Sequence, residues 1–170
     1  MSVSKARRCF LPLDDPRATP ERLSGYLSMV DRPLTALLAR QRLRCVAPGR
    51  FVYQSQPLRL LRFELIPTVS LQATWEAGEL RILSGESRIS GLGGWDQILA
   101  FCLEARLRPG TGGLEGEAGI TLSRPTTLPR WAHSLSGAAL DQALGRIERR
   151  LHGGLRRDLL AWLCDTADSS

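Results

Sequence analysis

The chain has 170 residues, 43% of them hydrophobic and 24% charged, and its formal net charge is +6 at neutral pH. These values are ordinary for a single soluble globular domain that buries a sizeable core. The sequence contains no run of about 18 apolar residues, which excludes a transmembrane helix. The N-terminal residues lack the apolar segment of a secretory signal, so we expect a cytoplasmic protein.

The positive charge indicates the class of binding partner, and the cysteine spacing indicates whether disulfides are expected. Lys5 is the only lysine, so arginine carries nearly all of the positive charge. This excess favours anionic partners, such as a membrane surface or an acidic protein. Aromatic residues make up only 6% of the chain and form no stacking pattern, so no nucleic acid is expected. Four scattered cysteines without a C-x-x-C pair predict free thiols at Cys9, Cys45, Cys102 and Cys164.

The first third of the chain has only weak patterns. Residues 1–20 show no periodicity, which predicts a loose N-terminal arm. Residues 25–30 are predicted to form a first strand, and residues 33–40 a short helix that is capped by Asp31. A hairpin is predicted over residues 43–55, because Pro-Gly separates two apolar segments within it.

Apolar and polar residues then alternate over residues 61–123, which is the pattern of strands with one buried face. We interpret Ala77-Gly78 and two glycine-rich segments as the turns between these strands. Pro67 keeps the alternation but has no N–H to donate, so it marks a bulge, a sheet edge or a break. The predicted strands cover residues 61–75, 80–89, 99–108 and 114–122.

The chain then forms an amphipathic helix, predicted over residues 140–163. An antiparallel sheet with one apolar face needs such a cover. Gly153-Gly154 interrupts the apolar stripe, and each glycine costs roughly 1 kcal/mol relative to alanine, so the helix either kinks there or stays straight and tolerates the pair. The stripe, with spacings of three and four, consists of Leu140, Leu144, Ile147, Leu151 and Leu155.

No catalytic or metal-binding motif is present in the sequence. On one helix, His133 and His152 would lie roughly 28 Å apart at about 1.5 Å per residue, too far to share a metal ion. The sequence has neither the G-K-[ST] of a phosphate loop nor a G-x-S-x-G nucleophile elbow. Asp158 lies beside the apolar stripe and is expected to pair with an arginine or cap a loop. We therefore predict no enzyme, no metal and no cofactor.

Short motifs recur in a fixed order over residues 21–162. They include Gly25-Tyr26-Leu27, the strand pattern Phe63-x-Leu65-x-Pro67-x-Val69-x-Leu71 and the helical ending Ile147-x-x-Arg150-Leu151. With these motifs the chain resembles a family of unknown function from cyanobacteria and plastids. That family is placed with the START-like, or helix-grip, superfamily of domains that bind lipids and other hydrophobic ligands. Residues 135–138 depart from it, because they keep only the glycine of the usual Glu-x-Thr-Gly-Asn.

The resemblance implies an α+β fold, in which a curved antiparallel sheet of six or seven strands grips a long C-terminal helix, often around a cavity. We expect one such domain over residues 21–165, with the arm before it and a tail at 166–170. The expected function is non-enzymatic binding of a lipid, isoprenoid or tetrapyrrole-like ligand. The side chains expected to line the cavity are Phe63, Leu71, Trp75, Leu99, Phe101, Leu103, Ile120, Leu144, Ile147 and Leu151.

Two alternatives remain open. In the first, the domain binds no ligand and docks on a partner protein or at the periphery of a membrane through the basic face of its helix. In the second, an enzyme of the same fold uses Asp158 or a histidine inside the pocket. The basic face points away from the apolar stripe, so folding is not expected to need it. It consists of Arg146, Arg149, Arg150, Arg156 and Arg157.

Overall fold

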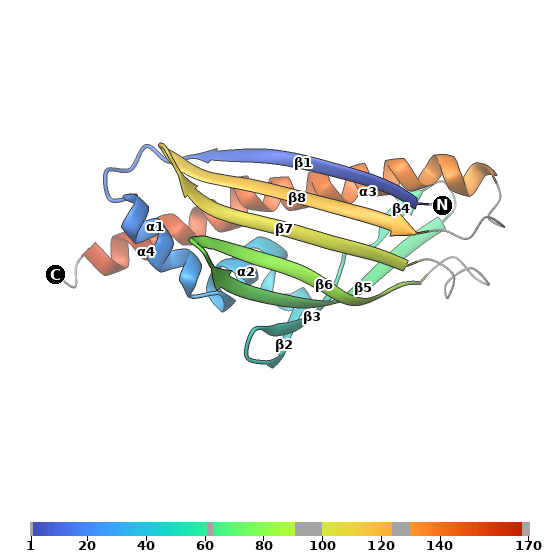
Figure 1. The fold of residues 1–170 in the computed structure, drawn as a ribbon, viewed down its shortest axis with the longest axis horizontal. Coiled ribbons are helices and arrows are strands. Elements are labelled where there is room, and N and C mark those ends of the chain that lie inside the picture. Colours follow the sequence, from blue (N-terminus) through green and yellow to red (C-terminus); the bar gives the residue numbers. More distant parts are fainter. Residues whose placement is uncertain (1, 61–62, 91–99, 124–129, 168–170) are drawn as a thin grey trace.

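Within the described residues, eight antiparallel strands curve around a long C-terminal helix in the computed structural model (Figure 1). The structure describes residues 2–60, 63–90, 100–123 and 130–167. The strands are β1 (Ser2–Pro12), β2 (Leu43–Ala47), β3 (Arg50–Gln54), β4 (Leu58–Leu60), β5 (Phe63–Glu76), β6 (Glu79–Ser90), β7 (Ala100–Gly110) and β8 (Gly113–Ser123). Their order in the sheet is β1-β8-β7-β6-β5-β3-β2, and β4 pairs with β5 outside this row.

The helices lie on the concave side of the sheet and at one of its ends (Figure 1). They are α1 (Pro20–Ser28), α2 (Asp31–Leu38), the 3-10 turn η1 (Arg40–Arg42), α3 (Arg130–Arg150), the π-helical segment η3 (Leu151–Leu155) and α4 (Arg156–Ala167). The long helix α3 crosses the concave face, and α1 and α2 cover the end near α4. No helix in the described part of the chain is both long enough and apolar enough to cross a lipid bilayer.

This architecture confirms the predicted α+β fold, in which a curved antiparallel sheet grips a long C-terminal helix. The hairpin predicted around Pro48-Gly49 is also present, as β2 paired with β3. Pro67 does not break its strand, because it lies within β5 and pairs with Ile89 of β6.

The loose arm predicted for residues 1–20 is wrong, because residues 2–12 form the edge strand β1. This strand pairs with β8 along its whole length, from Ser2 opposite Ser123 to Pro12 opposite Gly113. Lys5 lies opposite the buried Ile120, and directly opposed residues share a face of the sheet, so a lysine occupies an inward position. An inward row that includes charged residues lacks the apolar alternation by which strands are recognised.

The inward charges of β1 have partners on α3. The Lys5 ammonium lies 3.7 Å from the carboxylate of Asp141. The Arg7 guanidinium lies 3.0 Å from the carboxylate of Glu148. These contacts join the edge of the sheet to one flank of the helix, so β1 is anchored through charge as well as through its ladder.

The strand predicted over residues 25–30 is also wrong, because those residues belong to the end of α1 and the turn that follows it. Thr19 caps α1 by accepting a hydrogen bond from the backbone N–H of Arg22, and Pro20 occupies its first position. The next helix, α2, begins at Asp31 itself, and its capping residue is Val30, which makes no side-chain cap. The predicted capping role of Asp31 is therefore wrong by one position.

The C-terminal helix is longer than predicted and changes its winding at the glycine pair. Residues 151–155 form the π turn η3 between α3 and α4. Leu151, Leu155, Leu159 and Leu163 are all buried at spacings of four. Four residues exceed one α-helical turn by about 40°, so such a series would drift around a regular helix. The wider π turn takes up part of this excess and keeps the four leucines on the core side.

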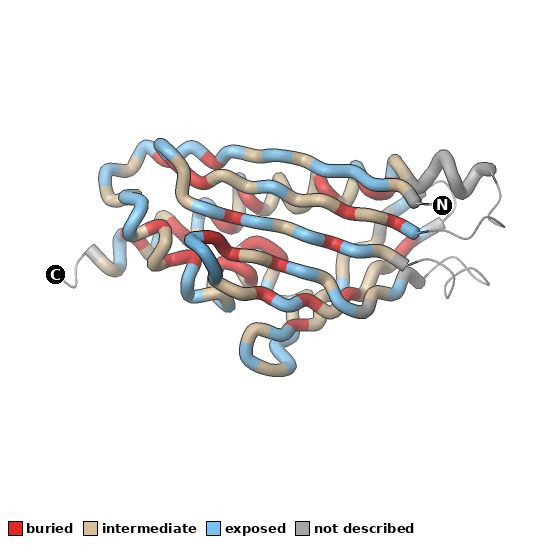
Figure 2. The backbone as a smooth tube through the Cα atoms, viewed as in Figure 1, coloured by how far each residue is buried: buried red, intermediate tan, exposed pale blue. Residues whose placement is uncertain are grey.

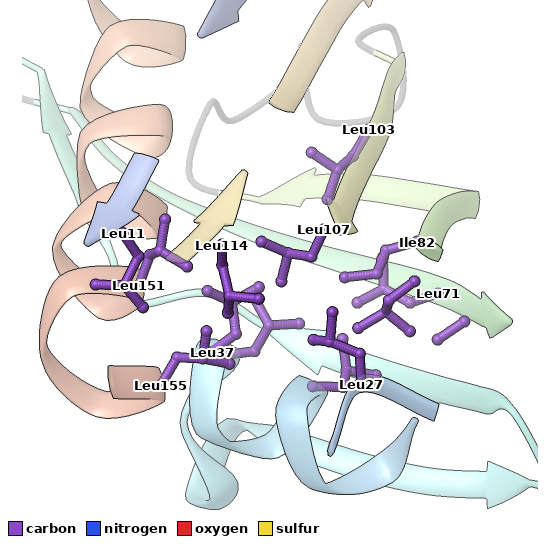
Figure 3. Packing of buried hydrophobic residues seen from close by; sticks show 14 of the residues in the cluster. Leu11, Leu27, Leu37, Leu71, Ile82, Leu103, Leu107, Leu114, Leu151 and Leu155 are labelled. Atoms are coloured by element: carbon purple, nitrogen blue, oxygen red, sulfur yellow. The ribbon is translucent and has the colours of Figure 1, made fainter. Parts of the chain in front are cut away.

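The core is packed most tightly where α1, α2 and η3 meet the sheet. Figure 2 shows buried positions alternating with exposed ones along the strands and concentrated at this end. Figure 3 shows Leu27 and Leu37 of the short helices beside Leu114 and Leu155. Leu80, Leu114 and Leu155 have no exposed surface. Burial of each such side chain stabilises the fold by about 1.5–3 kcal/mol.

Candidate functional site

The candidate site is the interior between the concave sheet and α3. Leu71, Leu103 and Leu151, drawn in Figure 3, belong to one buried cluster together with Ile120 and Leu144. Trp75, Phe101 and Ile147 are partly buried and pack against that cluster. The helical stripe therefore faces the sheet, as predicted. Two of the residues expected in the interior, Leu99 and the side chain of Phe63, lie outside the described residues.

One end of the interior is covered by side chains that the sequence analysis did not place there. α2 corresponds to the predicted short helix, but its burial against the sheet was not foreseen. α1 stands where the end of the arm and the first strand were expected. The signal was present in Thr19-Pro20, which together form a helix start, followed by apolar residues at spacings of three and four. The buried residues of these two helices are Leu23, Tyr26, Leu27, Pro33, Leu34, Leu37 and Leu38.

At the opposite end of the sheet, side-chain hydrogen bonds take over from the backbone ladder between β6 and β7. Within the described residues, their backbone ladder joins only residues 80–83 to residues 104–107. A bulge in β6 follows, because Leu71 pairs with Ser84 whereas Val69 pairs with Ser87. On both sides of the bulge, serine hydroxyls replace backbone groups as partners of β7. This part of the sheet is therefore joined by side chains rather than by a continuous ladder.

Two serines make these contacts. The Ser87 hydroxyl donates to the carbonyl of Phe101 at 2.6 Å and accepts from its N–H at 3.1 Å. The Ser84 hydroxyl accepts from the N–H of Leu103 at 2.7 Å. The hydroxyls thus satisfy backbone groups of β7 beside two of the predicted interior residues, Phe101 and Leu103.

The predicted basic face divides into two groups. Arg146 donates hydrogen bonds of 2.7 Å to the carbonyls of Gln56 and Pro57. Arg150 donates one of 2.7 Å to the carbonyl of Ala36 at the end of α2. These two residues are therefore bound to the main chain of other segments and do not form a free basic surface. Long arginine side chains fold back along the helix to reach main-chain carbonyls. Three arginines remain exposed, namely Arg149, Arg156 and Arg157.

Helix α3 consequently closes the curved sheet at both of its edges. One flank carries Asp141 and Glu148, which meet the cations of β1. The other flank carries Arg146 and Arg150, which bind carbonyls after β3 and in α2. The apolar stripe lies between the two flanks, so the polar contacts set the rotation of the helix over the interior.

Asp158 ties the short helices to α4. Its carboxylate accepts a hydrogen bond of 2.7 Å from the Tyr26 hydroxyl and two from Arg32, at 3.0 and 3.2 Å. Burial raises the pKa of Asp158, but the bonds from Arg32 and Tyr26 outweigh it, and the pKa lies below its usual value. Burial, with the contact to Asp158, raises the pKa of Tyr26. This carboxylate is fully engaged in joining α1 and α2 to α4.

Other candidate chemistry is not assembled in the described part of the chain. His152 is exposed, and the side chain of His133 lies outside the described residues. No group of three metal-ligating side chains gathers within the ranges that the structure describes. All four cysteines are unpaired, as predicted. A shallow hollow of about 540 Å³ lies between residues 13–17 and α4, and it contains none of the predicted interior residues.

Comparison with known proteins supports the fold. No protein-family model and no curated protein matches this chain. Among solved structures, a START superfamily protein from Mycobacterium smegmatis matches 92% of this chain and 97% of its own, at 8% identity and a TM-score of 0.51. Ara h 8.0201 matches 92% of this chain and 99% of its own, at 16% identity and a TM-score of 0.49. The first similarity, together with the architecture, shows that the fold is START-like.

Proposed function

We propose that this START-like domain is a non-enzymatic binding module that holds an apolar ligand between the sheet and α3. The lipid, isoprenoid and tetrapyrrole classes suit an interior lined by leucine, isoleucine and aromatic side chains. The narrower resemblance, to the family from cyanobacteria and plastids, remains a prediction because no family model matches the chain.

The observation that carries this proposal is the uneven burial of the apolar side chains on the concave side. The largest fully buried ones lie where α1, α2, η3 and α4 meet the sheet, and they include Leu11, Leu34 and Leu159. Toward the other end, Phe101 and Ile147 face the same interior but stay only partly buried. Core side chains are normally packed to crystal-like density, so partly covered apolar groups on an inner face are typical of a ligand-binding interior.

The engagement of Asp158 supports a module that does not catalyse a reaction. Its oxygens already accept from Tyr26 and Arg32, which leaves it a connecting role between helices. Ser84 and Ser87, which lie beside Leu103 and Phe101, are likewise used as partners of the β7 backbone.

Native mass spectrometry of the purified protein tests the proposal. We expect a bound apolar molecule that is released on denaturation, or uptake of 1-dodecanol as an added probe. Ala105→Leu adds bulk to the inner face of β7 and should reduce uptake. Cys102→Leu adds bulk to the outer face of the same strand, where Cys102 is exposed, and should leave uptake unchanged. A wild type that neither carries nor takes up an apolar molecule would show that the proposal is wrong.

The docking alternative now rests on the three exposed arginines. Each arginine near an anionic bilayer contributes about 1 kcal/mol, and salt screens the attraction. Co-sedimentation with phosphatidylserine vesicles at low and high salt compares the wild type with the triple variant Arg149→Glu, Arg156→Glu, Arg157→Glu. Docking predicts that only the wild type pellets, and only at low salt. Equal pelleting of both proteins contradicts it.

A further inference from the structure

Three arginines gather beside Tyr53, where α3 meets β3 and the end of α2. They are Arg42 from η1 and, one helical turn apart on α3, Arg146 and Arg150. Burial raises the pKa of Tyr53, while a hydrogen bond with Ser55 and the charges of all three arginines act in the opposite direction. Burial lowers the pKa of Arg146, Tyr53 acts in the opposite direction, and the charges of Arg149 and Arg42 add to the lowering. Geometry also brings Arg42 and Arg146 together, because Arg42 donates to the carbonyl of Ser55 and Arg146 to the carbonyls of the next two residues, Gln56 and Pro57.

This cluster has no compensating negative charge in the described part of the chain. None of the three arginines forms an ion pair there, whereas Arg7, Arg17 and other arginines do. Each arginine instead donates to a main-chain carbonyl. Arg42 donates to the carbonyl of Ser55, Arg146 to that of Gln56 and Arg150 to that of Ala36. Carbonyl groups satisfy some N–H donors but carry no net charge. Partly buried cations in this setting repel one another, and an anion between them would remove the repulsion.

Polar atoms without partners lie in the same cluster. Among the residues that the structure describes, the buried Nε atoms of Arg42 and Arg150 have no hydrogen-bond acceptor, and the buried Oε1 of Gln142 has no donor. Gln142 lies one helical turn before Arg146, so it shares the flank of the helix that carries the arginines. Buried polar atoms in native proteins nearly always have a partner, so atoms without one call for an explanation such as a bound ion or water.

The cluster borders the proposed ligand interior. Tyr53 lies opposite the buried Val69 in the pairing of β3 with β5, which places its ring on the concave side. We infer that Arg42, Arg146 and Arg150, with Tyr53 and Gln142, bind the anionic head group of a ligand whose apolar tail occupies the interior. This inference rests on the proposed function.

A carboxylate or a phosphate monoester fits the donors. Guanidinium groups present N–H donors in a planar fork that matches the oxygens of either anion. A hydroxyl on the ligand or a proton on the phosphate would donate to the Gln142 oxygen, which no protein group satisfies. The expected ligand class is therefore an amphiphile with one acidic head, rather than a neutral hydrocarbon or sterol.

Calorimetric titration with dodecanoate, dodecyl phosphate and 1-dodecanol tests this inference, because the three probes share one tail and differ in the head. We expect at least one anion to bind the wild type about tenfold more tightly than the alcohol. This ratio corresponds to a difference of about 1.4 kcal/mol in binding free energy. The preferred anion distinguishes a carboxylate ligand from a phosphate. The preference should decrease as salt is raised.

Variants locate the head-group site. Arg42→Gln and Tyr53→Phe should remove most of the preference for the anion while the affinity for the alcohol stays unchanged. Arg157→Gln removes the same charge from an exposed position of α4 and should leave the preference intact. Equal affinities of the wild type for all three probes would overturn the head-group site and leave the apolar module standing. If no probe binds, both proposals are wrong.

Discussion

The guanidinium of Arg150 occupies the space in which a side chain at Gly154 would have to begin. A Cβ atom on Gly154 would lie 2.7 Å from Cζ of Arg150 and 2.8 Å from the carbonyl oxygen of Ala36. The π turn therefore needs glycine at this position so that the end of α2 can approach the helix. A Cβ atom on the neighbouring Gly153 would have no other atom within 4 Å.

The glycine pair gives the first prediction. Gly154→Ala should destabilise the protein by about 1–3 kcal/mol, because the backbone carbonyl of Ala36 has to move. Gly153→Ala should leave the stability unchanged or raise it by up to about 1 kcal/mol, because alanine is the better helix former. Urea unfolding of both variants measures the difference. Equal effects of the two substitutions would contradict the close approach of α2.

A second prediction concerns Asp158 and acid. The pKa of this carboxyl lies below its usual value in the folded protein, so its contribution to stability is present above the unfolded pKa, near 3.8, and is lost as the pH falls through the lower folded value. Asp158→Asn should cost about 1–2 kcal/mol at neutral pH, because the ionised contact with Arg32 is lost and the site is partly exposed.

Thermal unfolding between pH 7 and pH 2 provides the test. The stability of Asp158→Asn should fall less steeply with acid than that of the wild type. Asp141→Asn serves as the control, since Asp141 pairs with Lys5 only at 3.7 Å and both side chains are about half exposed, so this substitution should have little effect. Parallel acid curves for the wild type and Asp158→Asn would rule out the proposed role.

The serine contacts between β6 and β7 give a third prediction. Ser87→Ala removes the partner of both backbone groups of Phe101 and should cost about 1–2 kcal/mol. It should also speed amide exchange at Phe101, because no other strand ladder protects that edge of β7. Hydrogen exchange followed by NMR measures this. Ser123→Ala, at an exposed position of β8, is the control and should change neither quantity.

A fourth prediction concerns the turn between β5 and β6. Ala77 and Gly78 both have positive φ, at 52° and 77°, and this conformation strains any residue with a Cβ atom. Ala77→Gly should therefore stabilise the protein by up to about 1 kcal/mol. The same substitution at Ala73, a buried residue inside β5, should destabilise it. If Ala77→Gly also lowers the melting temperature, the turn geometry is not as described.

The predictable part of the fold is the part whose side chains are sorted by polarity. β5, β7 and β8 alternate cleanly, and the helical stripe has the correct spacing, so the sheet and its covering helix follow from hydrophobic pattern alone. β1 was missed because Lys5 and Arg7 stand in its inward row, and the strand is recognisable only once their partners on α3 are known. Charge pairs between distant segments leave no local pattern.

The candidate site was predictable only in its apolar lining. Leu103 and Leu151 follow from the same patterns as the fold. Arg146 and Arg150 of the head-group cluster were placed on the helix correctly, but their carbonyl partners were not foreseen, and Arg42 was not singled out. A backbone carbonyl is the same at every residue, so no residue type marks Gln56 or Ala36 as the acceptor. Such contacts become visible only in three dimensions.

The pairing of β1 with β8 also determines when the protein can complete its fold during synthesis. The hydroxyls of Ser4 and Thr121 meet across a sequence separation of 117 residues. β1 emerges from the ribosome before β8, so it lacks this partner until β8 has been made, and its ion pairs wait longer still for α3. Such non-local pairing slows folding and leaves the early segments exposed in the meantime. A polar and charged β1 suits that interval, since a strand rich in exposed leucine would associate with other chains before its own partner was made.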